Sequence, residues 1–160
     1  MTISDYFTSD RQEHWREQIG KSDWRAGQFL YQLLCEGRLQ EHVGEAVKLL
    51  LLTDGDELVS FCTLAPRDDV PDCELTPWIG FVYTFPRYRG QRLMGRLLRY
   101  AEEAASAAGW DAVYISTDHV GLYEKYGYTF HTVLQDLRGD ETRVYRKTLQ
   151  EQNTPGISTI

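Results

Sequence analysis

The sequence predicts an α/β protein of the mixed α+β kind, in which helices cover both faces of one central sheet. Helical and strand-like segments follow the order helices, hairpin, strand–helix, strand–helix and hairpin. The segment from Trp78 to Ala108 reads as a strand, a glycine-containing turn and a helix, so its strand and the next one should be parallel neighbours. The 160 residues, 42% of them hydrophobic, suffice for one core. We therefore expect a single domain over residues 1–150 and a flexible tail at 151–160.

Two helices are predicted in the first forty residues, and a short strand could precede them. Asp10 is placed to begin the first helix, and Trp15 and Ile19 lie four residues apart on one face of it. Ser22 is a candidate N-cap for the second helix. The apolar face of the second helix comprises residues spaced three and four apart, namely Ala26, Phe29, Leu30, Leu33 and Leu34.

A β-hairpin and a long loop come next. Residues 47–52 and 58–64 are apolar runs of strand length, and the Asp-Gly pair at 54–55 is a strong signal for a tight turn between them. Residues 66–77 contain three prolines and are predicted to form a loop. The loop also carries four acidic residues, Asp68, Asp69, Asp72 and Glu74. Such a cluster either attracts a cationic amine or is simply solvated.

The central segment, Trp78 to Ala108, has the pattern of an anion site. Residues 79–85 are uncharged and rich in β-branched and aromatic side chains, and Pro86 ends the strand. Apolar residues then recur at helical spacing, so free backbone N–H groups and the positive helix end converge after the turn. The turn and the helix add five arginines, Arg87, Arg89, Arg92, Arg96 and Arg99. The chain as a whole is acidic, with 24 acidic and 17 basic residues, so a local cluster of arginines needs an explanation. The five arginines form either a solvated helix face or a binding site for phosphate groups.

The remaining segments complete the sheet. Residues 111–117 read as a buried strand and residues 119–126 as a short helix that Gly127 can end. Residues 128–134 and 142–149 are predicted as two closing strands joined by a turn.

Two motifs resemble those of the GNAT superfamily of N-acyltransferases. The run Arg89-Gly90-Gln91-Arg92-Leu93-Met94 is similar to the pyrophosphate-binding motif Q/R-x-x-G-x-G/A, with Arg92 and Met94 in place of its small residues. The run from Gly121 to Tyr128 resembles the family signature L-Y-E-K-x-G-F. The resemblance covers about residues 5–150. It implies a GNAT-like mixed, mostly antiparallel sheet in which two parallel strands splay apart to admit coenzyme A.

The resemblance also implies acetyl-coenzyme A as co-substrate, without a metal. The diphosphate would sit on the turn, and the pantetheine would extend the backbone hydrogen bonding of the strand. The residues expected to contact the cofactor are Val82, Tyr83, Thr84, Arg89, Gly90, Gln91, Arg92, Leu93, Met94, Gly95, Arg96 and Asp118.

For catalysis, Tyr123 matches the tyrosine that many family members use as general acid toward the leaving thiolate; otherwise it is a packing residue. Many members carry a glutamate on the central strand, but this strand has no acid. Glu74 and His119 are therefore the candidate bases, and His119 could equally be an ordinary surface histidine. Three aromatic residues either line an acceptor pocket or belong to the core, namely Trp24, Trp78 and Tyr83.

The predicted function is an N-acetyltransferase that transfers an acetyl group from acetyl-coenzyme A to a primary amine by direct attack. The alternative is a non-catalytic acyl-coenzyme A sensor or assembly module of the same fold. None of the three cysteines lies in either motif, which favours direct attack. The acceptor is expected to be a small-molecule or peptide amine, and the family resemblance allows a homodimer.

Composition excludes several other classes. The net charge of −7 argues against nucleic-acid binding. No apolar run approaches 18 residues and no secretory signal is visible, so we expect neither a membrane span nor secretion. Free thiols and these absences together predict a cytoplasmic protein.

Overall fold

The computed structural model describes residues 1–71 and 73–149, so Asp72 and the predicted tail at 151–160 lie outside it. The described chain forms one seven-stranded sheet in the order β1-β2-β3-β4-β5-β7-β6. The strands are β1 (Thr2–Asp5), β2 (Lys48–Asp54), β3 (Glu57–Ala65), β4 (Trp78–Thr84), β5 (Ala112–Thr117), β6 (Thr129–Gln135) and β7 (Glu141–Thr148). The α-helices are α1 (Gln12–Ile19), α2 (Arg25–Cys35), α3 (Leu39–Val43) and α4 (Leu93–Ala107). Single 3₁₀ turns are η1 (Tyr6–Thr8), η2 (Pro86–Tyr88) and η3 (Tyr123–Tyr126).

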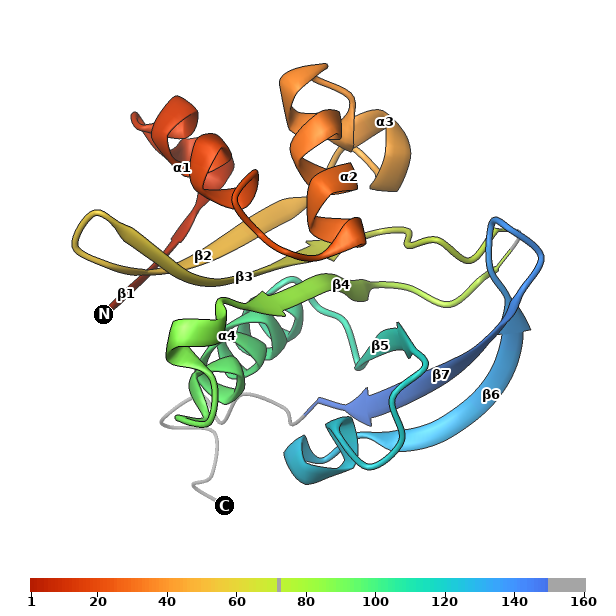
Figure 1. Cartoon of the computed structure of the whole chain (residues 1–160). Coiled ribbons are helices and arrows are strands. Elements are labelled where there is room, and N and C mark those ends of the chain that lie inside the picture. Colours follow the sequence, from red (N-terminus) through yellow and green to blue (C-terminus); the bar gives the residue numbers. More distant parts are fainter. Residues whose placement is uncertain (72, 150–160) are drawn as a thin grey trace.

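The predicted fold class is confirmed. Neighbouring strands are antiparallel except β4 and β5, which are parallel, as the strand–helix unit required. Helices α1, α2 and α3 lie on one face of the sheet and α4 lies on the other (Figure 1). On the first face Ile19 and Leu30 pack with Leu51, and on the second Leu97 packs with Val113. Burial of each such side chain stabilises the fold by about 1.5–3 kcal/mol.

The predicted hairpin is confirmed as β2 and β3, which pair from Lys48↔Leu64 to Asp54↔Glu57. Gly55 in its turn has a φ of +60°, a conformation that favours glycine. The short strand that could precede the helices is β1, which pairs with β2 at Thr2↔Thr53.

Three details of the N-terminal helices differ from the prediction. The residue before α1 is Arg11 rather than Asp10. Ser22 does not cap α2, because the helix begins only at Arg25 and the Ser22 Oγ is buried without a partner among the described residues. Phe29 belongs to the predicted apolar face of α2 but is 41% exposed. The buried face of this helix therefore includes fewer residues than the apolar face predicted from the sequence. Helix α3 was not predicted.

The prediction of a short helix at 119–126 is wrong for most of that segment, because only its last turn, η3 (Tyr123–Tyr126), is helical. Gly121 has a φ of +86°, which is incompatible with a right-handed helix passing through it. Residues 118–120 are instead exposed loop. The predicted end of the segment is confirmed, because Gly127 closes η3 with a φ of +92°.

The parallel pair at the centre of the sheet is open along most of its length. Strands β4 and β5 pair only at Trp78↔Tyr114, where the Tyr114 N–H donates to the Pro77 carbonyl over 3.1 Å. Beyond that point the strands separate, and β6 and β7 curve away from the β1–β4 half (Figure 1). The carboxyl-terminal end of β4 therefore has an edge that β5 does not cover.

Candidate active site

The open edge of β4 is lined by the backbone of Val82 and Thr84. The Phe85 N–H donates to the Val59 carbonyl on β3, and the Tyr83 carbonyl accepts from the Ser60 hydroxyl on the same strand. Backbone polar groups alternate in direction along a strand. Those of Val82 and Thr84 therefore point away from β3, into the space where β5 diverges.

A bulge interrupts β4 beside this edge. The register of β3 and β4 shifts between Phe61 and Thr63, and Phe81 has a φ of +49°. A non-glycine residue in this region costs of order 1–3 kcal/mol, and such strain clusters at functional sites. The bulge redirects the backbone of β4 next to the point where the two parallel strands part.

The turn between β4 and α4 is exposed and open. Gly90, with a φ of +81°, has no atom within 4 Å of where a β-carbon would stand. Arg92 precedes α4 with a φ of 58° and makes no side-chain cap. The first N–H groups of α4 therefore receive no cap from Arg92, and the turn presents them to solvent at the positive end of the helix dipole.

Side chains at the start of α4 leave this turn clear. Leu93 and Met94 are partly buried and pack against the core on the α4 face of the sheet. Gly95 lies under the ring of Tyr126 from η3. Gln91 is exposed in the turn itself.

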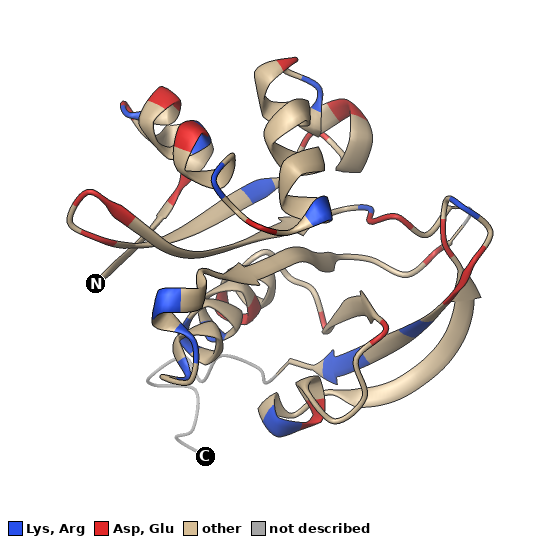
Figure 2. Ribbon diagram, viewed as in Figure 1, with Lys and Arg blue, Asp and Glu red and all other residues tan. Residues whose placement is uncertain are grey.

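The five arginines of this segment divide into two groups. Arg87 pairs with Glu57 over 2.9 Å, and Arg89 donates to the Thr84 carbonyl over 2.9 Å and lies 3.8 Å from Asp23. The others are Arg92, Arg96 and Arg99. These three are exposed and form no ion pair with any acid in the described part of the chain. Figure 2 shows blue positions on the ribbon at the start of α4. The uncompensated positive charge is thus concentrated at the helix start.

Tyr123 lies on the first turn after the β5 loop and is only 5% exposed. It packs in the core of the α4 face, with its ring 6.0 Å from that of Tyr128. Burial, assisted by the neighbouring Cys62 and Asp68, raises the pKa of the Tyr123 phenol, so it stays protonated at neutral pH. Full proton transfer from this phenol is therefore more uphill than its ordinary pKa suggests, and hydrogen-bond donation is its easier contribution.

The three aromatic residues predicted as pocket walls separate into two places. Trp24 stacks on Tyr83, with ring centroids 5.5 Å apart, and the Tyr83 hydroxyl donates to Asp23. Trp78 lies at the other end of β4, where its indole N–H donates to the Leu75 carbonyl over 2.7 Å. Trp78 also lines a cavity of about 290 Å³ beneath the 66–75 loop.

This geometry can be compared with known proteins. A profile of the acetyltransferase (GNAT) family matches residues 5–128, which is most of the chain. The chain belongs to the GNAT acetyltransferase family. No curated protein matches it in a sequence comparison.

Several solved structures share this GNAT fold. An aminoglycoside 6'-N-acetyltransferase from Enterococcus faecium is 18% identical, with a TM-score of 0.68 over 96% of this chain and 100% of the other. An aminoglycoside 6'-N-acetyltransferase complexed with coenzyme A is 15% identical, with a TM-score of 0.64 over 96% and 100%. A GNAT N-acetyltransferase from Escherichia coli in complex with coenzyme A is 19% identical, with a TM-score of 0.66 over 93% and 81%. At these identities the likeness concerns the fold alone. Separately, none of the helices within residues 1–71 and 73–149 is long and apolar enough to cross a membrane.

The remaining site candidates lie on the surface of this GNAT protein. His119 and Asp118 are exposed on the loop after β5. Glu74 is exposed and lines an open groove against β6. No contact of the described structure joins the Glu74, Asp118 or His119 side chain to Tyr123.

Sequence reasoning missed Asp68, an acid whose charge does act on Tyr123, because it treated this residue only as part of an acidic loop. The Asp68 carboxylate lies against Gly80 of β4, where a β-carbon would collide with it. A signal was available in the sequence: a glycine inside a strand often marks a place where another group approaches closely.

Proposed function

We propose that this GNAT protein transfers an acetyl group from acetyl-coenzyme A to a primary amine of a small molecule. The observation that carries the proposal is the open edge of β4, which leads at its carboxyl-terminal end into the exposed turn with Arg92. The aminoglycoside acetyltransferases with the same fold favour a small-molecule acceptor over a peptide. Free thiols at Cys35, Cys62 and Cys73 fit a reducing cytoplasm, where we place the reaction.

The residues at the turn fit the phosphate groups of coenzyme A. N–H groups from Gly90 to Met94 can supply converging donors at a helix start, which is how proteins commonly bind phosphate. The Gly95 N–H already donates to the Arg92 carbonyl over 3.2 Å. Arg92 and Arg96 can add charge-assisted hydrogen bonds. Arg89 holds the Thr84 carbonyl, so it would shape the site more than it would bind the ligand.

The open edge of β4 fits the pantetheine arm. Amide groups of the arm can pair with the backbone of Val82 and with the Thr84 N–H as an added strand would, since Arg89 already occupies the Thr84 carbonyl. A backbone N–H at the β4 bulge can also stabilise the oxygen of the thioester as negative charge develops on it.

Direct attack by the amine is the supported mechanism. The Cys62 thiol is buried near Tyr123, and burial raises its pKa, so it is not a thiolate nucleophile. A neutral amine attacks the thioester carbonyl carbon, the C–N bond forms, and the C–S bond breaks. The Tyr123 hydroxyl, which stays protonated, can donate a hydrogen bond to the departing sulfur.

Calorimetric titration with coenzyme A tests the binding half of the proposal. Arg92→Ala combined with Arg96→Ala should raise the dissociation constant at least about tenfold, because each charge-assisted bond contributes about 1.5–3 kcal/mol. Arg87→Ala is the matched control, since Glu57 already occupies that guanidinium. An unchanged constant in the double variant would reject the phosphate site.

Turnover separates the enzyme from the alternative, a non-catalytic sensor. Thiol release from acetyl-coenzyme A should be measured with a panel of small primary amines. Acceptor-dependent release supports transfer, whereas tight coenzyme A binding without release from any amine would favour the sensor.

A further inference from the structure

The carboxylate of Asp68 occupies the place that a side chain at position 80 of β4 would take. Asp68 belongs to the loop after β3, yet its Oδ1 lies against the Cα of Gly80 in the middle of β4. Thr63 Oγ1 lies 3.2 Å from the position that a β-carbon at residue 80 would take. A side chain at position 80 would displace the carboxylate, so the glycine and the loop acid fit each other.

The loop holds Asp68 at this place by several contacts. The Arg67 N–H donates to the Val43 carbonyl over 2.9 Å, and its guanidinium donates to the Glu41 carbonyl over 3.1 Å. Thr76 donates to the Pro66 carbonyl over 2.9 Å, which closes the loop on itself. These contacts fix the residues on the amino-terminal side of Asp68.

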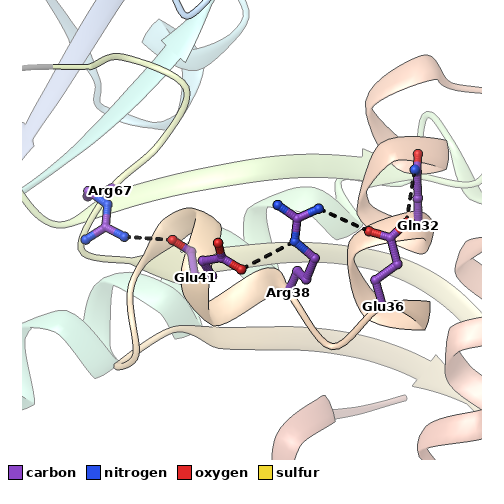
Figure 3. Close-up of polar contacts among 5 residues, drawn as sticks. All are labelled: Gln32, Glu36, Arg38, Glu41 and Arg67. Carbon is purple, nitrogen blue, oxygen red and sulfur yellow. Dashed lines mark hydrogen bonds and ion pairs between the residues drawn. The ribbon is translucent and has the colours of Figure 1, made fainter.

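Polar contacts extend this anchoring into the helices. Figure 3 shows Arg67 joined to Glu41, Glu41 to Arg38, and Arg38 to Glu36 at the end of α2. On the other side of Asp68, the Leu137 N–H donates to the Asp69 carbonyl over 2.9 Å. The carboxylate is thus placed by groups from α3 and from the β6–β7 turn.

A cavity of about 290 Å³ opens beside this carboxylate. Its walls include the acid itself, the apolar side chains of Val70 and Leu137, the indole of Trp78, and His42. Among the described residues, the lining is mostly apolar, with Asp68 as its one acid and Arg67 as its one arginine. It suits a small amine whose carbon skeleton contacts the walls and whose ammonium group faces the acid.

The charged and titratable groups around Asp68 favour removal of a proton from such an amine. Burial and the charge of Asp69 raise the pKa of Asp68 well above its ordinary range. Asp68 in turn raises the pKa of Tyr123, together with Cys62. The other described titratable side chains that line the cavity are Arg67, His42 and the free thiol of Cys73. The Asp68 carboxylate lies at Gly80, close to the point where β4 and β5 part, and its charge acts on the Tyr123 phenol, which is not one of the residues lining this cavity.

We propose that the cavity under the 66–75 loop admits the acceptor as a cationic primary amine, and that Asp68 is the base that takes its proton. This inference rests on the proposed acetyl transfer. The ammonium group gives one proton to Asp68, and the neutral amine then attacks the thioester carbonyl carbon. As the C–S bond breaks, the sulfur takes a proton from Tyr123. The new amide nitrogen releases its second proton, which restores the phenol, and Asp68 returns the first proton to solvent.

The test compares Asp68→Asn with a control, Asp54→Asn, which replaces an exposed aspartate at the end of β2. With a cationic small amine at pH 7, kcat/KM should fall by a factor of about 10²–10⁴ in Asp68→Asn and stay unchanged in Asp54→Asn. The deficit should shrink as the pH approaches the pKa of the amine, because the neutral amine then no longer needs the base. Coenzyme A binding by calorimetry should be unchanged in both variants.

The outcomes separate the two proposals. An active wild type with an equally active Asp68→Asn overturns the role of Asp68 and leaves acetyl transfer intact. A pH-independent deficit also overturns it, because loss of the carboxylate would then act through structure alone. A wild type that binds coenzyme A but acetylates no amine overturns both. Asn is isosteric and removes a partly buried charge, so folding should be retained, which thermal unfolding verifies.

Discussion

Tyr126 lies directly on Gly95, with its ring carbon Cε1 2.9 Å from the position that a β-carbon at residue 95 would take. This contact links the segments that carry the two motifs, because Gly95 lies in the first turn of α4, next to Met94, and Tyr126 lies in η3, which also carries Tyr123. The helix start and the candidate general acid are thus positioned against each other.

The first prediction concerns this contact. Gly95→Ala should destabilise the protein by about 1–3 kcal/mol through overpacking, less the gain of up to about 1 kcal/mol in helix propensity. Chemical denaturation of Gly95→Ala, Tyr126→Ala and the double variant gives the coupling energy. We expect a coupling of about 0.5–3 kcal/mol, with the penalty of Gly95→Ala relieved when the ring is absent. Strict additivity would show that the ring does not constrain position 95.

Arg92 combines strain with charge, and two substitutions separate them. Its left-handed backbone costs roughly 1–2 kcal/mol for a non-glycine residue. Arg92→Gly should therefore unfold at a higher denaturant concentration than Arg92→Ala, while both variants lose the same affinity for coenzyme A. Equal stabilities would indicate that the backbone at position 92 relaxes once its side chain is shortened.

Two buried tyrosines, Tyr123 and Tyr128, provide a test variant and a matched control for the role of Tyr123 in the chemical step. Tyr123→Phe should lower turnover strongly and leave the coenzyme A dissociation constant unchanged, since only the proton-donating group is lost. Tyr128 has its hydroxyl engaged by Glu102 over 2.8 Å, so Tyr128→Phe should lower stability and keep turnover. The opposite pattern, with Tyr123→Phe fully active at every pH, would assign Tyr123 to packing.

The Glu102–Lys147 ion pair should be the strongest of the recorded salt bridges. Its nitrogen–oxygen distance is 2.8 Å, and the side chains are 11% and 29% exposed. Glu102→Ala also leaves the buried Tyr128 hydroxyl without its hydrogen-bond acceptor, so this substitution should lower the free energy of unfolding by about 1–3 kcal/mol. Asp56→Ala, which breaks the exposed pair with Arg11, should cost less than about 1 kcal/mol. Similar losses in the two variants would contradict this ranking.

The titration of Asp68 predicts a pH dependence of stability. Its pKa is raised in the folded state, so the native protein binds this proton more tightly than the unfolded chain does. The stabilisation is present below about pH 4 and is lost as the pH rises through the raised pKa. Asp68→Asn should therefore become progressively more stable than wild type between pH 4 and neutrality. The difference between the two denaturation profiles reports Asp68 together with its coupling to the neighbouring Asp69, whose charge contributes to the raised pKa of Asp68. Parallel profiles would show that the carboxylate is not desolvated.

The sequence by itself determined the features that depend on neighbouring residues. The Asp-Gly turn between β2 and β3, the proline that ends β4, and the glycine-bounded start of α4 all follow from local backbone preferences, and the structure has them. The order of these elements then fixed the parallel pairing of β4 and β5. The two motifs indicated the family because each is a short, contiguous run.

Only the tertiary structure decided which distant residues meet. Strand β1 exists because β2 offers it an edge, and the 119–126 segment is not a helix because Gly121 turns the chain. Arg89 resembles a ligand residue in the motif, yet it is held by Thr84 and Asp23. Asp68 and Gly80 are twelve positions apart, and their contact depends on anchors from α3 and the β6–β7 turn. Periodicity and turn chemistry describe neighbours along the chain, whereas such a contact depends on the balance of all the surfaces that pack together.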